Sequence, residues 1–201
     1  FDDLAGNAGT SVTSTSDSTS VTLDDTVPTL TSVSIDSDNA ETAASAETAT
    51  NGDTVTLSFT GSETLSANAG GGKPACAFTL SGTAATNADT VANPSGNDWT
   101  CAFELADADA NAAVAFTITF DDLAGNAGTA VTATSDSTAV TYDGTKPTLT
   151  ITSTDADTGG RHNGAITLTF TFNEEMTGIA DGDFTASASS GTCVMSNYVV
   201  T

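Results

Sequence analysis

The strongest constraint on the fold of this chain is an internal repeat. Residues 1–31 return as residues 120–150, and only six positions differ between the two copies. In the first copy the differing positions are Ser11, Ser14, Ser20, Leu23, Asp25 and Val27. Self-similarity at a fixed period is typical of a tandem array of structural units. We therefore expect the 201 residues to be a window of a longer protein.

The repeat predicts three domains along the chain. Residues 28–146 form one complete unit, which we call the central repeat, and residues 1–27 are the C-terminal end of a preceding unit. Residues 147–201 begin a following unit, because PTLT at 147–150 repeats PTLT at 28–31. A second match, TLTFTFNEEM with TLSFTGSETL, places residues 167–176 in register with residues 56–65. Its shorter offset indicates a shorter first loop in the following unit.

The charge of the chain excludes several partners. It carries 26 acidic residues against 3 Lys and Arg, a formal net charge of −23. Binding to nucleic acid needs clustered cations, so we expect no nucleic-acid partner, and anionic membrane surfaces are disfavoured for the same reason. No apolar run approaches the roughly 18 residues of a membrane helix, so no membrane insertion is expected. Disorder is disfavoured because 38% of the residues are hydrophobic and alternate with polar ones.

Alternation of apolar and polar side chains predicts an all-β fold. In VTLSFT, for example, Val55, Leu57 and Phe59 share one face of an extended segment. The strands expected in the central repeat are 29–36, 53–60, 75–80, 98–105, 113–120 and 129–142, with a further short strand within 83–91. About seven short strands in a domain of this length are typical of an immunoglobulin-like β-sandwich. The following unit has one strand with an apolar face of Ile166, Leu168, Phe170 and Phe172.

Three motifs carry a resemblance to a known family. FTITFDDLAGNAG is followed by a Thr/Val strand and YDGTKPTLT, and a strand ends in Phe59 to Glu63. The turn Asp122 to Asn126 and the linkers Asp24 to Thr29 and Asp143 to Thr148 complete the pattern. The chain thus resembles the bacterial immunoglobulin-like tandem repeats of giant extracellular adhesin and surface filament proteins. The resemblance implies tandem immunoglobulin-like β-sandwich domains, one complete and two partial, and linkers often stiffened by calcium.

Acidic side chains are expected to gather where the linker meets the central repeat. Successive strands of a sandwich run up and down, so the strands ending near residues 60 and 120 point to the same end. The residues expected there are Asp24, Asp25, Glu63, Asp121, Asp122 and Asn126. Calcium binds about six to eight hard oxygen ligands, which carboxylates and carbonyls supply. The next junction would use Asp143, Glu174 and Glu175, and Asp36, Asp38 and Glu41 could approach it.

The alternative for these acids is that they are solvated loop residues that cap turns, as Asp and Asn often do. Asp107, Asp109 and Asn111 imitate the start of an EF-hand loop. We reject this loop, because Ala112 and Ile118 occupy the positions that require Gly and Glu.

Two of the three cysteines, Cys76 and Cys101, fall on the apolar phase of predicted strands. In the immunoglobulin arrangement these strands lie in opposite sheets, so a disulfide could cross the core beside Trp99. Two buried free thiols are the alternative. Cys193 is left over, and its partner is expected beyond residue 201, with an intermolecular bond as the alternative. Cysteines in a chain rich in Ser and Thr favour an extracellular location.

Enzymatic motifs are absent from the sequence, and we expect no catalysis. The only histidine, His162, lies in the turn sequence GGRHNG without a nucleophile beside it. The expected function is that of a structural segment, a spacer, stalk or fibre body of a surface or filament protein. Its partners would be neighbouring repeats or other copies of the chain. The alternative is an adhesin module that binds a glycan or surface ligand. Strand donation between chains is a third option.

Overall fold

Short β-strands joined by turns make up the computed structural model of this protein. The structure describes residues 1–39, 46–67, 73–154, 166–176 and 179, and these residues contain strands but no helix. The predicted all-β class is therefore confirmed. The chain divides into two parts, Phe1–Gly144 and Thr145–Thr201. The boundary between them lies close to the predicted end of the central repeat at residue 146.

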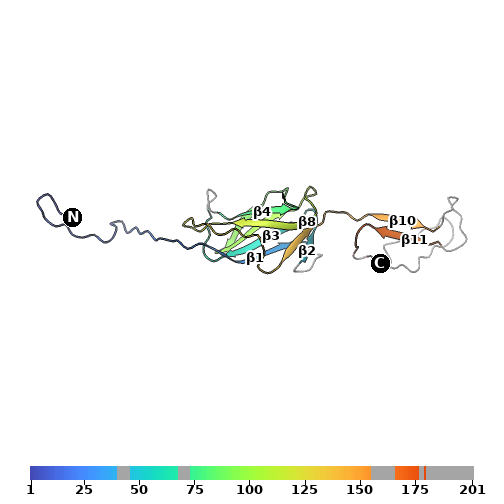
Figure 1. Ribbon diagram of the computed structural model, residues 1–201, viewed down its shortest axis with the longest axis horizontal. Helices are drawn as coiled ribbons and strands as arrows, with labels where there is room; N and C mark the ends of the chain where they lie inside the picture. The colour runs from blue at the N-terminus through green and yellow to red at the C-terminus, as the bar shows by residue number, and fades with distance from the viewer. Residues whose placement is uncertain (40–45, 68–72, 155–165, 177–178, 180–201) are drawn as a thin grey trace. The chain divides into compact units, whose positions relative to one another are not determined.

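Four antiparallel strands form the first sheet of the central repeat (Figure 1). Their order is β1 (Leu30–Ser37), β3 (Thr54–Gly61), β7 (Asp98–Glu104) and β6 (Thr90–Ser95). In β3 and β7 every second side chain is buried, which is the period expected of strands with one face on the core.

Five strands form the second sheet. Their order is β2 (Ala46–Ala49), β9 (Ala139–Tyr142), β8 (Ala112–Thr119), β4 (Ala75–Leu80) and β5 (Thr83–Ala84). The pair β2 and β9 is parallel, and the other pairs of this sheet are antiparallel.

One hydrophobic core lies between the two sheets. Its buried side chains come from both sheets and include Leu57, Phe59, Trp99, Ile118 and Tyr142. Across the layers the rings of Phe78 in β4 and Phe103 in β7 lie 4.5 Å apart between centroids. The side chains that alternation predicts to face inward therefore meet in a single cluster.

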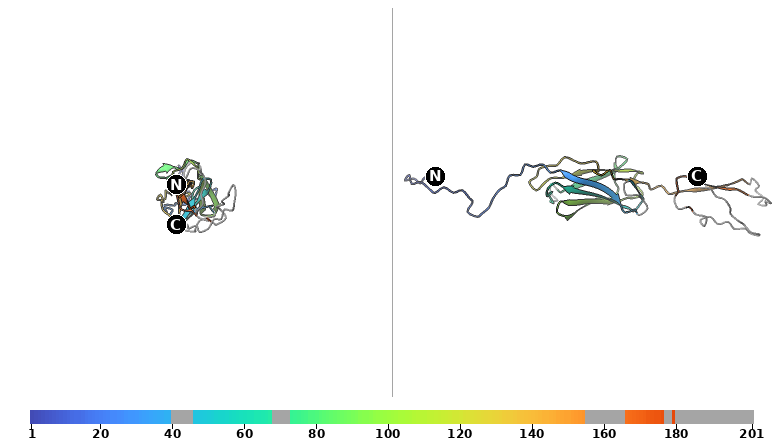
Figure 2. Two further views of the ribbon diagram at one scale, coloured as in Figure 1. Left: turned by 90° about the vertical axis from the view of Figure 1, so that its right-hand side faces the viewer. Right: turned by 90° about the horizontal axis from the view of Figure 1, so that it is seen from below.

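The chain enters the central repeat at one end of its strands and leaves at the other (Figures 1 and 2). Strand β1 starts at Leu30 beside Gly61, the end of β3, and β9 ends at Tyr142 beside Ala112, the start of β8. Because β8 has eight residues, these two ends are separated by about 26 Å.

Three expectations for the strands need correction. The expected strand 129–142 is a strand only at β9, and before it Val131 alone forms an isolated bridge, to Ile118. The expected strand within 83–91 is two pieces, β5 and β6, in different sheets. Strand β2 is additional, and its AETA sequence carries no alternation that could have predicted it.

The second part of the chain contains a two-stranded antiparallel sheet of β10 (Leu149–Ser153) and β11 (Leu168–Phe172). The N–H of Thr148 donates to Asn173 Oδ1, and the N–H of Asn173 donates back to the carbonyl of Thr148. In the central repeat, Thr29 and Ser62 make the matching pair of bonds. The same strand ending thus occurs in both parts.

The N-terminal copy of the repeat reproduces the turn of the central repeat. Asp3 accepts hydrogen bonds from the N–H and side-chain amide of Asn7, as Asp122 does from Asn126. The glycine inside the turn has a positive φ in both copies, 87° at Gly6 and 93° at Gly125. Glycine adopts this conformation without the steric cost of a Cβ atom. Local sequence alone is therefore sufficient to form the turn.

Candidate functional site

Three carboxylates from distant segments meet at the end where the chain enters the central repeat. Asp24 lies in the linker, Glu63 follows β3, and Asp122 follows β8. One oxygen from each of Asp24, Glu63 and Asp122 lies within 4.8 Å of the others. We call these residues the linker triad.

The turn after β8 positions the most buried member of the triad. Asp122 is 2% exposed, and its main chain bridges to Leu65 in the loop that carries Glu63. Its Oδ1 accepts the N–H of Asn126 at 2.8 Å, and its Oδ2 accepts the Asn126 side-chain amide at 2.8 Å. The neighbouring Asp121 carbonyl accepts the N–H of Ser66. Asn126 thereby holds both oxygens of the Asp122 carboxylate, and main-chain bonds hold the turn against the loop that carries Glu63.

Asn126 also ties the turn to the linker. Its side-chain amide donates to the backbone carbonyl of Asp24 at 3.0 Å, across 102 positions of sequence. A second pair of bonds follows in the linker, where the N–H of Thr29 donates to Ser62 Oγ and the N–H of Ser62 donates to the Thr29 carbonyl. Pro28 between these points is buried. The linker is therefore bound to the repeat that follows it.

The charges of the triad oppose one another. Burial raises the pKa of Glu63 above its usual value, and the negative charges of Asp24 and Asp122 raise it further. Burial also raises the pKa of Asp122, but hydrogen bonds from Asn126, Gly125 and Ala124 outweigh it and the net shift is downward. The same hydrogen bonds that hold Asp122 therefore keep it ionised, and the repulsion falls on Glu63.

The other predicted junction residues lie elsewhere. Asp25 and Asp121 are outside the triad. The carboxylate of Asp143 accepts a hydrogen bond from the Asn111 side-chain amide. Glu174 and Glu175 belong to the second part of the chain, so their grouping with Asp143 stays a prediction. Of the residues expected at the far end, Asp38 accepts the N–H of Thr54, and Glu41 lies outside the described residues.

The chemistry of the triad fits a hard divalent cation such as calcium. All three side chains offer carboxylate oxygens, which calcium prefers. The carboxylate of Asp122 is ionised and is held in place by hydrogen bonds from its own turn. A bound cation would also relieve the repulsion that raises the pKa of Glu63. Asp24, Glu63 and Asp122 are the residues that would hold it.

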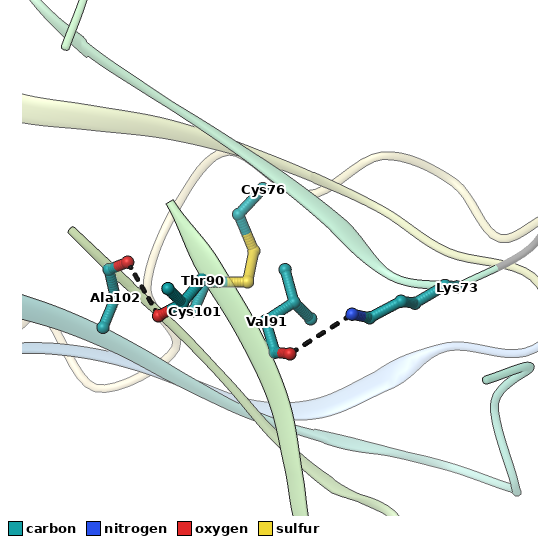
Figure 3. Close-up of a disulfide and its surroundings, with 6 residues drawn as sticks. All are labelled: Lys73, Cys76, Thr90, Val91, Cys101 and Ala102. Carbon is teal, nitrogen blue, oxygen red and sulfur yellow. Dashed lines mark hydrogen bonds between the residues drawn. A yellow bond between two sulfur atoms is a disulfide. The ribbon is translucent and has the colours of Figure 1, made fainter. Parts of the chain in front are cut away.

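The predicted disulfide joins the two sheets (Figure 3). It links Cys76 in β4 to Cys101 in β7, with a Cα–Cα distance of 6.3 Å. Beside it, Lys73 Nζ, in the segment just before β4, donates to the carbonyl of Val91 in β6. Cys193, like His162, lies outside the described residues.

Several contributors to this end of the molecule were missed by sequence reasoning. They are Ser62 and Thr29, which fasten the linker, and Gly128, whose close contact with Phe120 completes the turn after β8. The exact recurrence of Gly9 and Gly128 in the two copies is the signal that could have found the glycine.

A scan against protein-family models found no matching model, and searches of curated proteins and of solved structures found no match. The described residues include no helix long and apolar enough to cross a membrane.

Proposed function

We propose that this chain is a structural segment of a long extracellular surface or filament protein, in which tandem repeats act as a spacer or fibre body. One observation carries the proposal. A two-sheet unit receives the chain at one end and releases it at the other, and near-copies of its own sequence flank it. Such units stacked in series add length with each copy.

The strand order supports an immunoglobulin-like fold for each repeat. If the strands are lettered from A in that scheme, β1, β3, β7 and β6 correspond to A, B, E and D. Strands β9, β8, β4 and β5 correspond to G, F, C and an added C′, and β2 is a second segment of A that pairs with G. The disulfide departs from the antibody pattern, because it joins C to E rather than B to F.

An extracellular location agrees with the disulfide, since such bonds persist in oxidising compartments. We further propose that the linker triad binds calcium and that the bound ion stiffens the joint between the linker and the central repeat. Calcium held by Asp24 and by residues of the repeat body would link the linker to the repeat in addition to the bonds made by Asn126. This role supports a spacer whose bending is limited at the joints.

The arrangement gives less support to a ligand-binding module. Flat ligand platforms usually present exposed aromatic side chains. In residues 28–146 every phenylalanine and the tryptophan are buried: Phe59, Phe78, Phe103, Phe116, Phe120 and Trp99. Within this repeat, no exposed aromatic side chain is present to form such a platform.

Small-angle scattering from arrays of one, two and three copies of residues 28–146 tests the spacer function. We expect the maximum dimension to increase by a constant step of about 26 Å or more per copy, the length set by β8. The distribution of dimensions should narrow when calcium is added. Arrays that fold back into a compact body would contradict the proposal, and so would tight binding of a glycan by the single repeat.

A further inference from the structure

A hollow lies beside the disulfide, where the chain crosses from one sheet to the other. Strand β5 ends the second sheet and β6 ends the first, so the segment between them passes from sheet to sheet. Residues 84–89 of this segment form one wall of the hollow, and Cys76, Ala77 and Phe78 of β4 form the other. The volume of the hollow is about 320 Å³, which is room for several water molecules of about 30 Å³ each.

Hydrogen bonds position the wall formed by residues 84–89. The N–H of Ala85 donates to the Phe78 carbonyl at 3.0 Å. The N–H of Thr86 donates to Asp109 Oδ1 at 2.8 Å, and its hydroxyl donates to the same oxygen at 2.7 Å. The side-chain amide of Asn87 donates to a backbone carbonyl of β7 at 2.7 Å. The hollow is therefore a fixed feature of the fold.

The two half-cystines differ in their access to solvent. Cys76 lines the hollow and is 7% exposed, whereas Cys101 is 0% exposed and does not line it. A disulfide is opened by a thiolate that attacks one of its sulfur atoms, and the rate depends on access to that atom. A small thiolate that enters the hollow can therefore reach Cys76 but not Cys101.

The charges around the hollow select the kind of thiol. Lys73, just before β4, lies beside the disulfide (Figure 3), and a nearby cation stabilises a thiolate. Asp89, in the opposite wall, is exposed and supplies a carboxylate. The net charge of −23 disfavours a ligand with an overall negative charge. These conditions fit a small aminothiol, because its thiolate form also carries an ammonium group and has no net charge.

We propose that Cys76 is a site of reversible modification by a small aminothiol that enters this hollow. The thiolate forms a new S–S bond to the sulfur of Cys76. The bond between Cys76 and Cys101 breaks, and its electron pair goes to the Cys101 sulfur, which takes up a proton from water. No further oxidant or reductant takes part, because one disulfide is exchanged for another. In the reverse step the Cys101 thiolate attacks the sulfur of Cys76 and expels the aminothiol.

Peptide mapping of the folded full chain after reaction with cysteamine tests the site. Cys193 is replaced by Ser in every sample, so that only the disulfide reacts. Cleavage before aspartates separates the two half-cystines, because Asp89 and Asp98 lie between them. We expect the adduct on Cys76, with Cys101 closed to an alkylating reagent until the chain is unfolded. Equal or greater modification of Cys101, or a folded chain that does not react, would overturn the proposal.

The dependence of the rate on cysteamine concentration separates attack through the hollow from attack on unfolded chains. A reaction through the hollow speeds up in proportion to the concentration. A reaction that waits for unfolding levels off at the unfolding rate. We expect proportionality, and a plateau at the unfolding rate would contradict the route through the hollow.

A matched pair of variants tests the hollow itself. Ala88→Leu enlarges a side chain in its wall, whereas Ala92→Leu makes the same change at an exposed position of β6 outside it. We expect Ala88→Leu alone to slow the reaction, by a factor of about five or more, because access to Cys76 is reduced. Thermal melts check that both variants are folded. A folded Ala88→Leu protein that reacts at the wild-type rate would exclude the hollow as the entrance.

Mercaptoethanesulfonate tests the class of ligand, because it is similar in size to cysteamine but carries a negative group in place of the ammonium. At equal thiolate concentration we expect cysteamine to react faster by a factor of about three or more. Equal rates would overturn the assignment to aminothiols. None of these results bears on the spacer function, which is tested by the length of the array.

Discussion

Gly128 lies directly against the ring of Phe120, and a Cβ atom at this position would overlap the ring. The same contact recurs in the N-terminal copy between Gly9 and Phe1. The surroundings differ, because Phe120 is buried in the core with 3% exposure and Phe1 is 88% exposed. The chain therefore contains the same glycine–phenylalanine contact twice, once with the ring buried in the core and once with the ring exposed.

We predict that Gly128→Ala destabilises the central repeat by about 1–3 kcal/mol, the usual cost of overpacking a core. The matched change Gly9→Ala should leave stability unchanged, since Phe1 is free to move aside. Urea unfolding followed by the fluorescence of Trp99, the single tryptophan of the chain, measures both. Equal effects of the two changes would show that the core does not hold Phe120 in place.

We predict that the substitution Glu63→Gln in the linker triad affects stability in opposite directions with and without calcium. Glu63→Gln removes a repelled charge, so without calcium the variant should be at least as stable as the wild type. With calcium at about 100-fold its Kd, the wild type should gain about 2.7 kcal/mol, and the variant much less. Thermal melts with and without a chelator measure the difference. The control Glu104→Gln, at an exposed position of β7, should respond to calcium like the wild type.

The pH dependence of stability follows from the same groups. The pKa of Glu63 is raised from 4.5, so in calcium-free buffer the wild type gains stability as the pH falls through the raised value. The Glu63→Gln variant lacks this gain. Asp122 acts in the opposite direction, because its pKa is lowered from 3.8 in the folded protein. The stability that Asp122 contributes is present above pH 3.8 and is lost as the pH falls from 3.8 through the lowered pKa. Urea melts at a series of pH values separate the two effects.

At the scale of elements, the strands with alternating burial were predictable and the pieces fixed by tertiary contacts were not. Strands β3, β4, β7 and β8 follow from alternation alone. The segment before β9, residues 129–138, is rich in the β-branched residue Thr, but it leaves β8 after Val131, and hydroxyl groups of Ser135 and Thr138 accept hydrogen bonds from β1.

The linker triad, likewise, was predictable from the sequence only in part. The direction of successive strands was enough to bring Glu63 and Asp122 to the linker. The choice of Asp24 and Asp122 over their neighbours Asp25 and Asp121 depends on tertiary contacts such as the bond from Asn126 to the Asp24 carbonyl. The periodicity of apolar side chains in a strand carries no information about such tertiary contacts.

The turn after β8 gives a prediction about the joint. Asn126→Ala removes the side-chain bonds to Asp122 Oδ2 and to the Asp24 carbonyl, so that the buried Oδ2 loses this donor, while the backbone bond to Asp122 Oδ1 remains. We expect a loss of about 1–3 kcal/mol in the stability of the central repeat. Asn7→Ala is the matched control, because Asn7 bonds only within its own turn in the described contacts. Hydrogen exchange of the linker amides should increase in the first variant alone.

The disulfide between β4 and β7 limits how far a repeat can extend. It spans a sequence separation of 25 residues, which would add about 85 Å of chain if released. Reduction should lengthen each unfolding step in a pulling experiment by this amount. It should also lower the unfolding free energy by about 3.5 kcal/mol on the chain-entropy estimate. Steps of equal length in oxidised and reduced samples would exclude the bond from the folded protein.

For the whole molecule, the spacer function requires that each repeat closes its own core. In the central repeat the buried side chains of both sheets come from residues 33–142, and the disulfide lies inside the same range. The bonds from the linker add to this body at one end, through Asp24 and Thr29. A repeat that closes its own core can be added to an array in any number.

The most direct test is the equilibrium unfolding of residues 28–146 alone beside the full chain. We expect one cooperative transition for the isolated repeat, coincident in Trp99 fluorescence and far-ultraviolet circular dichroism, with a midpoint close to that of the full chain. A gradual transition, or a midpoint far below that of the full chain, would show that the repeat needs its neighbours to fold.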